Sequence, residues 1–142
     1  MAEGLYRSMK KDEDGLPVVE ASAKGLGVRS GRPKHNDVDL TDTGEVVLNG
    51  KGMSVASEWR KLKSWQIPSR LRVQWEGATG PEYLACFRLG DYRFINQEIN
   101  DDLAVKTDGP THAVISPRRQ VLLKEFEQAL AATRKDWEVD ES

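Results

Sequence analysis

The most regular hydrophobic pattern in the chain lies near its C-terminal end, where apolar residues recur at helical spacing. The residues that share this face are Leu122, Phe126, Ala129, Leu130, Thr133 and Trp137. Ser116 and Pro117 have the residue types of a helix N-cap and first turn. The spacing therefore predicts an amphipathic helix over residues 122–135, packed on a sheet through Phe126.

Shorter apolar runs, separated by turn residues, predict strands through the rest of the chain. The runs expected to form strands are residues 4–9, 16–20, 45–48, 53–55, 82–89, 92–95 and 111–115. Asn49 and Gly50 form a dipeptide typical of a hairpin turn, so the strand at 53–55 is expected just beyond a hairpin. Residues 25–36 contain three glycines, a proline and four basic residues, which predicts a loop.

A short second helix is expected over residues 58–63, capped by Ser57 and stopped by Pro68. An amphipathic helix on a sheet of short strands, without βαβ alternation, indicates an α+β fold with mostly antiparallel pairing. A chain of 142 residues has the length of one domain, so we expect a single domain over residues 1–142.

The composition indicates where in the cell this domain acts. Hydrophobic residues make up 38% of the chain and charged residues 31%, and no apolar run is long enough for a spanning helix, so we expect no membrane partner. The first residues lack the apolar run and cleavage site of a signal peptide. We therefore expect a cytoplasmic protein, either in the producing cell or, if it is secreted without a signal peptide, in a target cell.

The net charge, the one cysteine and the two histidines limit which ligands and reactions the chain can support. A net charge of −2 argues against sequence-blind nucleic-acid binding, which needs a basic field. Residues 59–65 nevertheless mix aromatics with cations, which leaves binding of single-stranded nucleic acid as one interpretation. The other interpretation is a solvated helix face with two tryptophans packed inward. The apolar neighbours of Cys86 predict a buried strand thiol. His35 is expected to be solvated, and it lies too far from His112 in sequence to indicate a metal site.

Three short clusters could carry chemistry. Arg7 follows Tyr6 on an apolar strand and is either a surface arginine or a guanidinium aimed at phosphate or ribose. The glycines before Ser54 either serve the turn or let the backbone approach a ligand. His112 is either a hydrogen-bonded structural histidine or a functional one. A hydrolase built on Ser54 and His112 is disfavoured, because the serine lacks a G-x-S-x-G elbow and no motif places a carboxylate against the histidine.

Taken in order, these clusters and their neighbours resemble the ADP-ribosyltransferase-like toxins typified by a cytoplasm-acting type VI secretion effector. The segments that carry the resemblance are Leu5-Tyr6-Arg7, Gly25-Leu26-Gly27-Val28-Arg29, Gly52-Met53-Ser54-Val55, Thr111-His112, Ser116-Pro117 and residues 129–137. The resemblance covers nearly the whole chain and is tightest over residues 111–137. The order and spacing of the segments carry it, rather than any single motif.

The resemblance implies split antiparallel β-sheets with a C-terminal amphipathic helix, similar to the mono-ADP-ribosyltransferase fold, and NAD bound between two small sheets. It implies Arg7, Ser54 and His112 as catalytic residues, which we therefore expect to converge on one pocket. The phosphates of NAD would lie near Arg7 and Arg29, and its nicotinamide end near Ser54. The residues implied for NAD binding are Tyr6, Arg7, Arg29, Gly52, Met53 and Ser54.

The same resemblance implies a toxin that acts in the cytoplasm and is neutralised by a cognate immunity or antitoxin protein. The chain departs from the wider fold in its third motif, where many transferases carry a glutamate and this strand offers His112 and Ser116. Glu98 lies in no matching motif, and Lys51 adds a charge beside the expected phosphate site. The alternative is therefore a catalytically degenerate member that binds a nucleotide or a protein without turnover.

Overall fold

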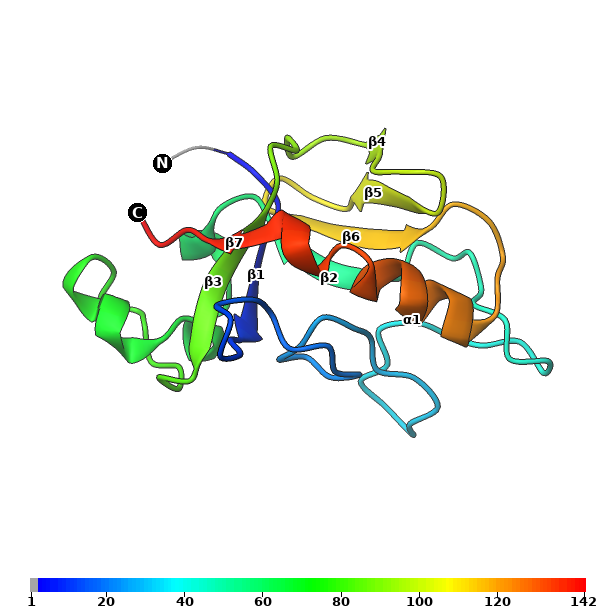
Figure 1. Cartoon of the computed structure of the whole chain (residues 1–142), viewed down its shortest axis with the longest axis horizontal. Coiled ribbons are helices and arrows are strands. Elements are labelled where there is room, and N and C mark those ends of the chain that lie inside the picture. Colours follow the sequence, from blue (N-terminus) through cyan, green and yellow to red (C-terminus); the bar gives the residue numbers. More distant parts are fainter. Residues whose placement is uncertain (1–2) are drawn as a thin grey trace.

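Residues 3–142 are described by the computed structural model of the chain. Within them, seven strands form one antiparallel sheet in the order β4-β5-β6-β2-β1-β3-β7 (Figure 1). The strands are β1 (Tyr6–Lys10), β2 (Met53–Ala56), β3 (Leu84–Leu89), β4 (Gln97–Glu98), β5 (Leu103–Thr107), β6 (His112–Pro117) and β7 (Trp137–Val139). The helices are α1 (Leu123–Ala131) and the short 3₁₀ helices η1 (Trp59–Lys61), η2 (Ser64–Gln66), η3 (Ser69–Val73) and η4 (Arg134–Asp136). The predicted α+β class with antiparallel pairing and a C-terminal helix is confirmed.

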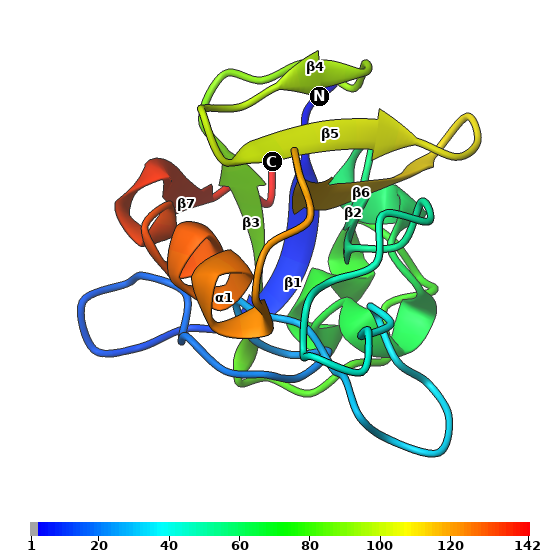
Figure 2. The ribbon, with the colours of Figure 1, turned by 90° about the vertical axis from the view of Figure 1, so that its right-hand side faces the viewer.

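The sheet bends sharply where β1 meets β2. These two strands pair at a single position, Tyr6 with Ala56, whereas β1 pairs with β3 at five positions and β2 with β6 at four. Figure 2 shows β5 and β6 crossing β1 and β3 at a steep angle. The sheet is therefore curled into two groups of strands, which stay joined rather than forming two separate sheets.

Side chains alternate between the two faces of the sheet, and each face buries a core. On one face, Leu5, Met9 and Phe87 pack with Phe126 and Leu130 of α1. Figure 2 shows α1 nearly end-on, in the angle between the two groups of strands. The curl of the sheet thus gives one helix contact with both groups.

The opposite face of β1 and β3 carries a second core, covered by the 3₁₀ helices. Its buried members are Tyr6, Trp59, Ile67, Leu71, Ala78 and Cys86. The prediction that Cys86 is a buried strand thiol is confirmed. Burial, assisted by the nearby Glu141, raises the pKa of this thiol to about 12, so it stays protonated at neutral pH.

The start of α1 differs from the prediction. Ser116 and Pro117 lie in β6 and do not cap the helix. Leu122 occupies the N-cap position and is 47% exposed, so the prediction that it belongs to the buried face is wrong. Phe126 and Leu130 are fully buried, and their placement is confirmed.

The helix also ends earlier than predicted. Thr133 donates its hydroxyl hydrogen to the Leu130 carbonyl at 2.7 Å, and the Trp137 indole N–H donates to the Thr133 oxygen at 3.0 Å. This local bonding turns the chain, because a threonine hydroxyl offers the last helical carbonyl an alternative partner. Trp137 then pairs with Leu89 in β7, rather than continuing the helix.

Three predicted strands do not form among the described residues. Residues 92–95 form no strand and bend at 94–95, and residues 16–20 and 45–48 make only isolated bridges. No hairpin forms at Asn49 and Gly50 either, although Gly50 takes a φ of +84° there. The reason is tertiary: β2 pairs with β1 and β6, and not with residues 45–48.

Other elements differ in type from the prediction or were not predicted. Residues 58–63 hold η1 in place of one regular helix, and the edge strand β4 has two residues. β5 pairs with the next strand, β6, across the short turn at residues 108–111, whereas β7 forms only through long-range pairing with β3. No helix among residues 3–142 is long and apolar enough to span a membrane, and those residues contain no group of three or more potential metal ligands.

Candidate functional site

A cavity of about 680 Å³ opens beside the place where β1 and β2 separate. Its walls come from β1, β2, the start of β6, the η1–η2 region and the loop over residues 23–37. Arg7, Ser54 and His112 all line it. The structure thus brings these three residues to one cavity, as expected from the sequence, while their catalytic roles stay predictions.

The register of β2 and β6 explains why Ser54 and His112 meet there. Ser54 pairs with Val114, and Ala56 pairs with His112. Residues two apart on a strand point to the same face, so Ser54 and His112 are diagonal neighbours on one side of the sheet. Ser54 is half-buried in this wall of the cavity.

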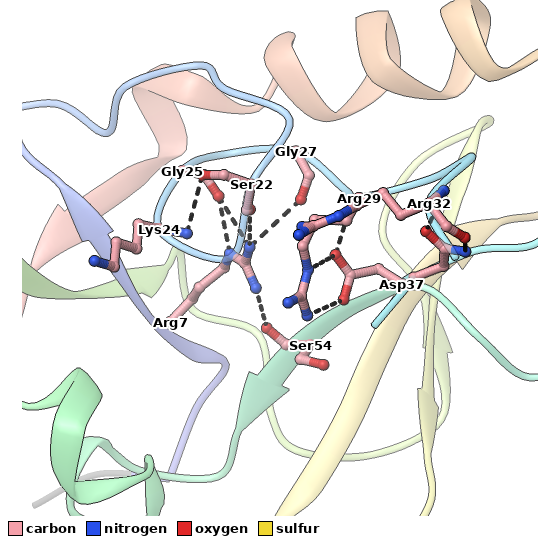
Figure 3. A network of polar contacts seen from close by, with 10 residues as sticks. Arg7, Ser22, Lys24, Gly25, Gly27, Arg29, Arg32, Asp37 and Ser54 are labelled. Carbon is pink, nitrogen blue, oxygen red and sulfur yellow. Dashed lines mark hydrogen bonds and ion pairs between the residues drawn. The ribbon is translucent and has the colours of Figure 1, made fainter. Parts of the chain in front are cut away.

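Arg7 is buried and ties the separating strands together. Its Nη1 donates to the Ser54 carbonyl at 2.9 Å, which bridges β1 to β2 where ladder hydrogen bonds end (Figure 3). Its Nε donates to the Gly25 carbonyl at 3.1 Å, and its Nη2 donates to the carbonyls of Ser22, Gly25 and Gly27. Burial lowers the pKa of Arg7 to about 10, although Asp37 opposes this shift.

These hydrogen bonds fit neither of the two roles predicted for Arg7. It is neither a surface arginine nor a guanidinium with its fork turned to a ligand, because the fork is engaged by protein carbonyls. One N–H of Nη1 remains for a bound group, since a guanidinium has five donors. A phosphate contact at Arg7 therefore stays a prediction, and a structural role is what the contacts display.

The loop that receives Arg7 depends on two glycines. A Cβ at Gly25 would lie 2.6 Å from the Cβ of Glu20, and one at Gly27 would overlap the Glu20 carbonyl. The loop can therefore fold tightly on itself only with glycine at both positions. That folding is what presents two of the carbonyl oxygens to Arg7.

Arg29 lines the cavity beside Arg7 and is held by Asp37 in a bidentate pair, at 3.1 Å from Nε to Oδ2 and 2.9 Å from Nη2 to Oδ1. This hydrogen bonding raises the pKa of Arg29. His35, in the same loop, has a φ of +65° and also lines the cavity. Its predicted exposure is confirmed, but it faces the site as well as solvent.

Three of the residues implied for NAD binding do not line this cavity. Tyr6 belongs to the second core, and its hydroxyl donates to Asp140 at 3.2 Å. Met53 belongs to the core under α1. Gly52 lies so close to β6 that a Cβ would overlap the Ile115 carbonyl, so its role here is close strand packing.

Lys51 and Glu98 lie away from this cavity as well. Lys51 pairs with Asp39 at 3.0 Å. Glu98, on the edge strand β4, pairs with Arg118 at 2.9 Å. Neither Lys51 nor Glu98 lines the cavity, so the structure supplies no glutamate there.

Sequence reasoning missed the wall formed by η1 and η2. Lys61, Lys63 and Trp65 line the cavity from this side. Trp59 packs inward as predicted, but Trp65 is 61% exposed, with the Lys63 ammonium 5.2 Å from its ring centroid. The alternation of aromatics and cations over residues 59–65 was the available signal.

The cavity has the opposite charge balance to the whole chain. Four permanent cations line it, at Arg7, Arg29, Lys61 and Lys63. Among the described residues, Asp37 is the one carboxylate of the lining, and it is engaged by Arg29. Since the chain carries a net charge of −2, the cations are concentrated at this site. Such an arrangement favours an anionic ligand.

Comparisons with protein-family models, with curated proteins and with solved structures gave no match for this chain. The residues themselves therefore carry the functional argument, because a fold alone does not assign an activity.

Proposed function

We propose that the cavity binds a nucleotide of the NAD class and that the protein is an ADP-ribosyltransferase-like toxin acting in the cytoplasm. The observation that carries the proposal is the concentration of cations around a cavity of dinucleotide size in an acidic protein. Ligand cavities commonly span about 300–1,000 Å³, and this one has about 680 Å³.

The phosphates of such a ligand find several donors in this lining. Arg29 is held in place by Asp37, so a contact from its remaining Nη1 donors costs little side-chain entropy. Lys61 and Lys63 supply exposed ammonium groups from the η1–η2 wall. The donor set therefore fits a pyrophosphate, which prefers several charge-assisted hydrogen bonds.

The ring systems of the ligand find an aromatic surface at Trp65. Trp65 is 61% exposed, so its indole offers a face on which a ring can stack. Ser54 and His112 lie on the strand wall of the cavity, where they would contact ribose and nicotinamide. In ADP-ribosyl transfer, NAD supplies the ribosyl carbon and nicotinamide departs, so the protein's task is to orient the ligand and stabilise developing charge.

The alternative is a degenerate binder without turnover. What favours it is the absence of any glutamate from the described lining of the cavity, together with the engagement of Asp37 by Arg29. For either form, the neutralising partner implied by the resemblance would be an immunity or antitoxin protein.

Calorimetric titration with NAD tests the proposal. We expect wild-type binding, and a loss of affinity of about tenfold or more in the double variant Lys61→Gln, Lys63→Gln, as for loss of charge-assisted contacts. The matched control is Lys124→Gln, Lys135→Gln, which removes two exposed lysines outside the cavity. No binding to the wild type at millimolar NAD would refute the NAD proposal.

A growth assay separates the toxin from the binder. Expression in bacteria should arrest growth, and the double variant should relieve the arrest. NAD binding without growth arrest or nicotinamide release would favour the degenerate alternative.

A further inference from the structure

The connection between β5 and β6 places a carboxylate against the histidine of the cavity. His112 Nδ1 lies 2.5 Å from Asp108 Oδ1. The backbone N–H of Asp108 also donates to the His112 carbonyl at 3.0 Å, which closes the turn. Gly109, with a φ of +152°, provides a conformation that other residues rarely adopt. The turn therefore holds the two side chains together.

The contact with Asp108 sets the tautomer of the His112 imidazole. A carboxylate accepts a hydrogen bond, so the proton of the neutral ring resides on Nδ1. Nε2 is then the ring nitrogen with a free lone pair. His112 lines the cavity and Asp108 does not, so the carboxylate contacts the histidine from outside the lining.

The surroundings suit proton transfer. Ser54 is the diagonal neighbour of His112 on the same face of the sheet. A base that is oriented by a third group and faces a cavity is the recurring arrangement for activating a nucleophile. Sequence reasoning had rejected such a base because no motif supplied the carboxylate, and the turn supplies it.

We propose that His112 Nε2 is the general base of the reaction and that Asp108 is its positioning residue, in place of the missing third-motif glutamate. The inference rests on the proposed function, with NAD as substrate. With water as acceptor, the C1′–N bond breaks and its electron pair leaves with neutral nicotinamide. A water oxygen forms the new bond to C1′, and its proton passes to His112 Nε2. The products are ADP-ribose, nicotinamide and one proton, which the histidine returns to solvent.

The pair contributes little to folding, which makes the test clean. The His112 and Asp108 side chains are 46% and 52% exposed. Ion pairs at that exposure contribute little to stability. Asp108→Asn should therefore leave the chain folded.

The first measurement needs no ligand. Nitrogen NMR of the imidazoles should show the Nδ1–H tautomer for His112 in the wild type and its loss in Asp108→Asn, with His35 as internal reference. An Nε2–H tautomer in the wild type would overturn the inference without touching NAD binding.

The second measurement is nicotinamide release. Asp108→Asn and His112→Gln should each lower kcat by about a hundredfold or more, and Asp108→Asn should keep KM and calorimetric affinity for NAD within about twofold of wild type. Asp108→Glu should restore part of kcat, and the control Asp42→Asn, in another exposed turn, should leave kcat unchanged. NAD binding with a kcat that is indifferent to Asp108, or with no turnover, overturns the base assignment alone. No NAD binding to the wild type overturns the proposed function as well.

Discussion

The two faces of the β1–β3 strand pair are covered in different ways. One face is covered by α1, whose Phe126 and Leu130 enter the larger core. The other is covered by short 3₁₀ helices, which bury Trp59 and Ile67 in the smaller core. The wall of the cavity that carries Lys61, Lys63 and Trp65 comes from this second cover.

The difference follows from the geometry of the covering elements. A regular helix satisfies its own backbone hydrogen bonds and can present one continuous apolar stripe, so the residues of its inward face all serve packing. A 3₁₀ turn is short and ends within a few residues, so buried and exposed positions follow each other closely. Trp59 and Trp65 show this, since the first is buried and the second is 61% exposed.

The largest effect should come from the α1 face. Phe126→Ala removes a fully buried aromatic from the larger core and should lower the unfolding free energy by about 3–5 kcal/mol. Urea denaturation measures it, with Leu122→Ala as control, because Leu122 is largely exposed and should cost far less. A loss below about 1 kcal/mol for Phe126→Ala would contradict the packing described.

A somewhat smaller effect is expected at the junction of the two strand groups. Arg7→Lys keeps the charge but cannot reach the carbonyls of Ser22, Gly25, Gly27 and Ser54 together. Buried acceptors left unsatisfied cost about 1–3 kcal/mol each, and partial compensation by the lysine makes a total of roughly 3 kcal/mol reasonable.

The control for this prediction is Arg72→Lys, since Arg72 is exposed and its Nε donates to the Ala78 carbonyl at 3.2 Å. Equal stability losses in the two variants would show that the Arg7 hydrogen bonds do not hold the curl. Loss of NAD affinity in an Arg7 variant is informative only once its folding is known.

The face covered by the 3₁₀ helices should make the stability of the protein depend on pH in alkaline solution. Burial, with Asp140 nearby, raises the pKa of Tyr6 from 10.0 to about 12. The unfolded chain therefore loses this proton at lower pH than the folded one. Its contribution to stability is complete below pH 10 and is lost as the pH rises towards 12, by up to about 1.4 kcal/mol per pH unit. Tyr6→Phe should flatten this part of the stability profile, and an unchanged profile would refute the shift.

The smallest effect on stability is expected at the exposed end of the same face. Trp65→Ala should change the unfolding free energy by less than about 0.5 kcal/mol, as for other exposed positions, while weakening NAD binding by about 1–2 kcal/mol through lost stacking. Thermal unfolding and calorimetry measure the two quantities. A large loss of stability with unchanged affinity would mean that Trp65 packs and does not bind.

Local pattern was enough to predict several elements of this protein. The period of Phe126 and Leu130 predicted α1, and apolar runs predicted β1, β2, β3 and β6. The apolar neighbours of Cys86 correctly predicted its burial. These features depend on residues close in sequence, which is why periodicity reveals them.

The sequence by itself determined the fold class, the buried stripe of the helix and the candidate trio of Arg7, Ser54 and His112. Only the tertiary structure decided that the guanidinium of Arg7 serves protein carbonyls, and that Asp108 faces His112. Loop and turn geometry set both outcomes: the chain over residues 22–27 folds back on β1 and presents its carbonyls to Arg7, and the turn between β5 and β6 holds Asp108 against His112. Periodicity does not reveal such contacts, because it reports which residues of a helix or strand share a face and not how the chain between strands folds.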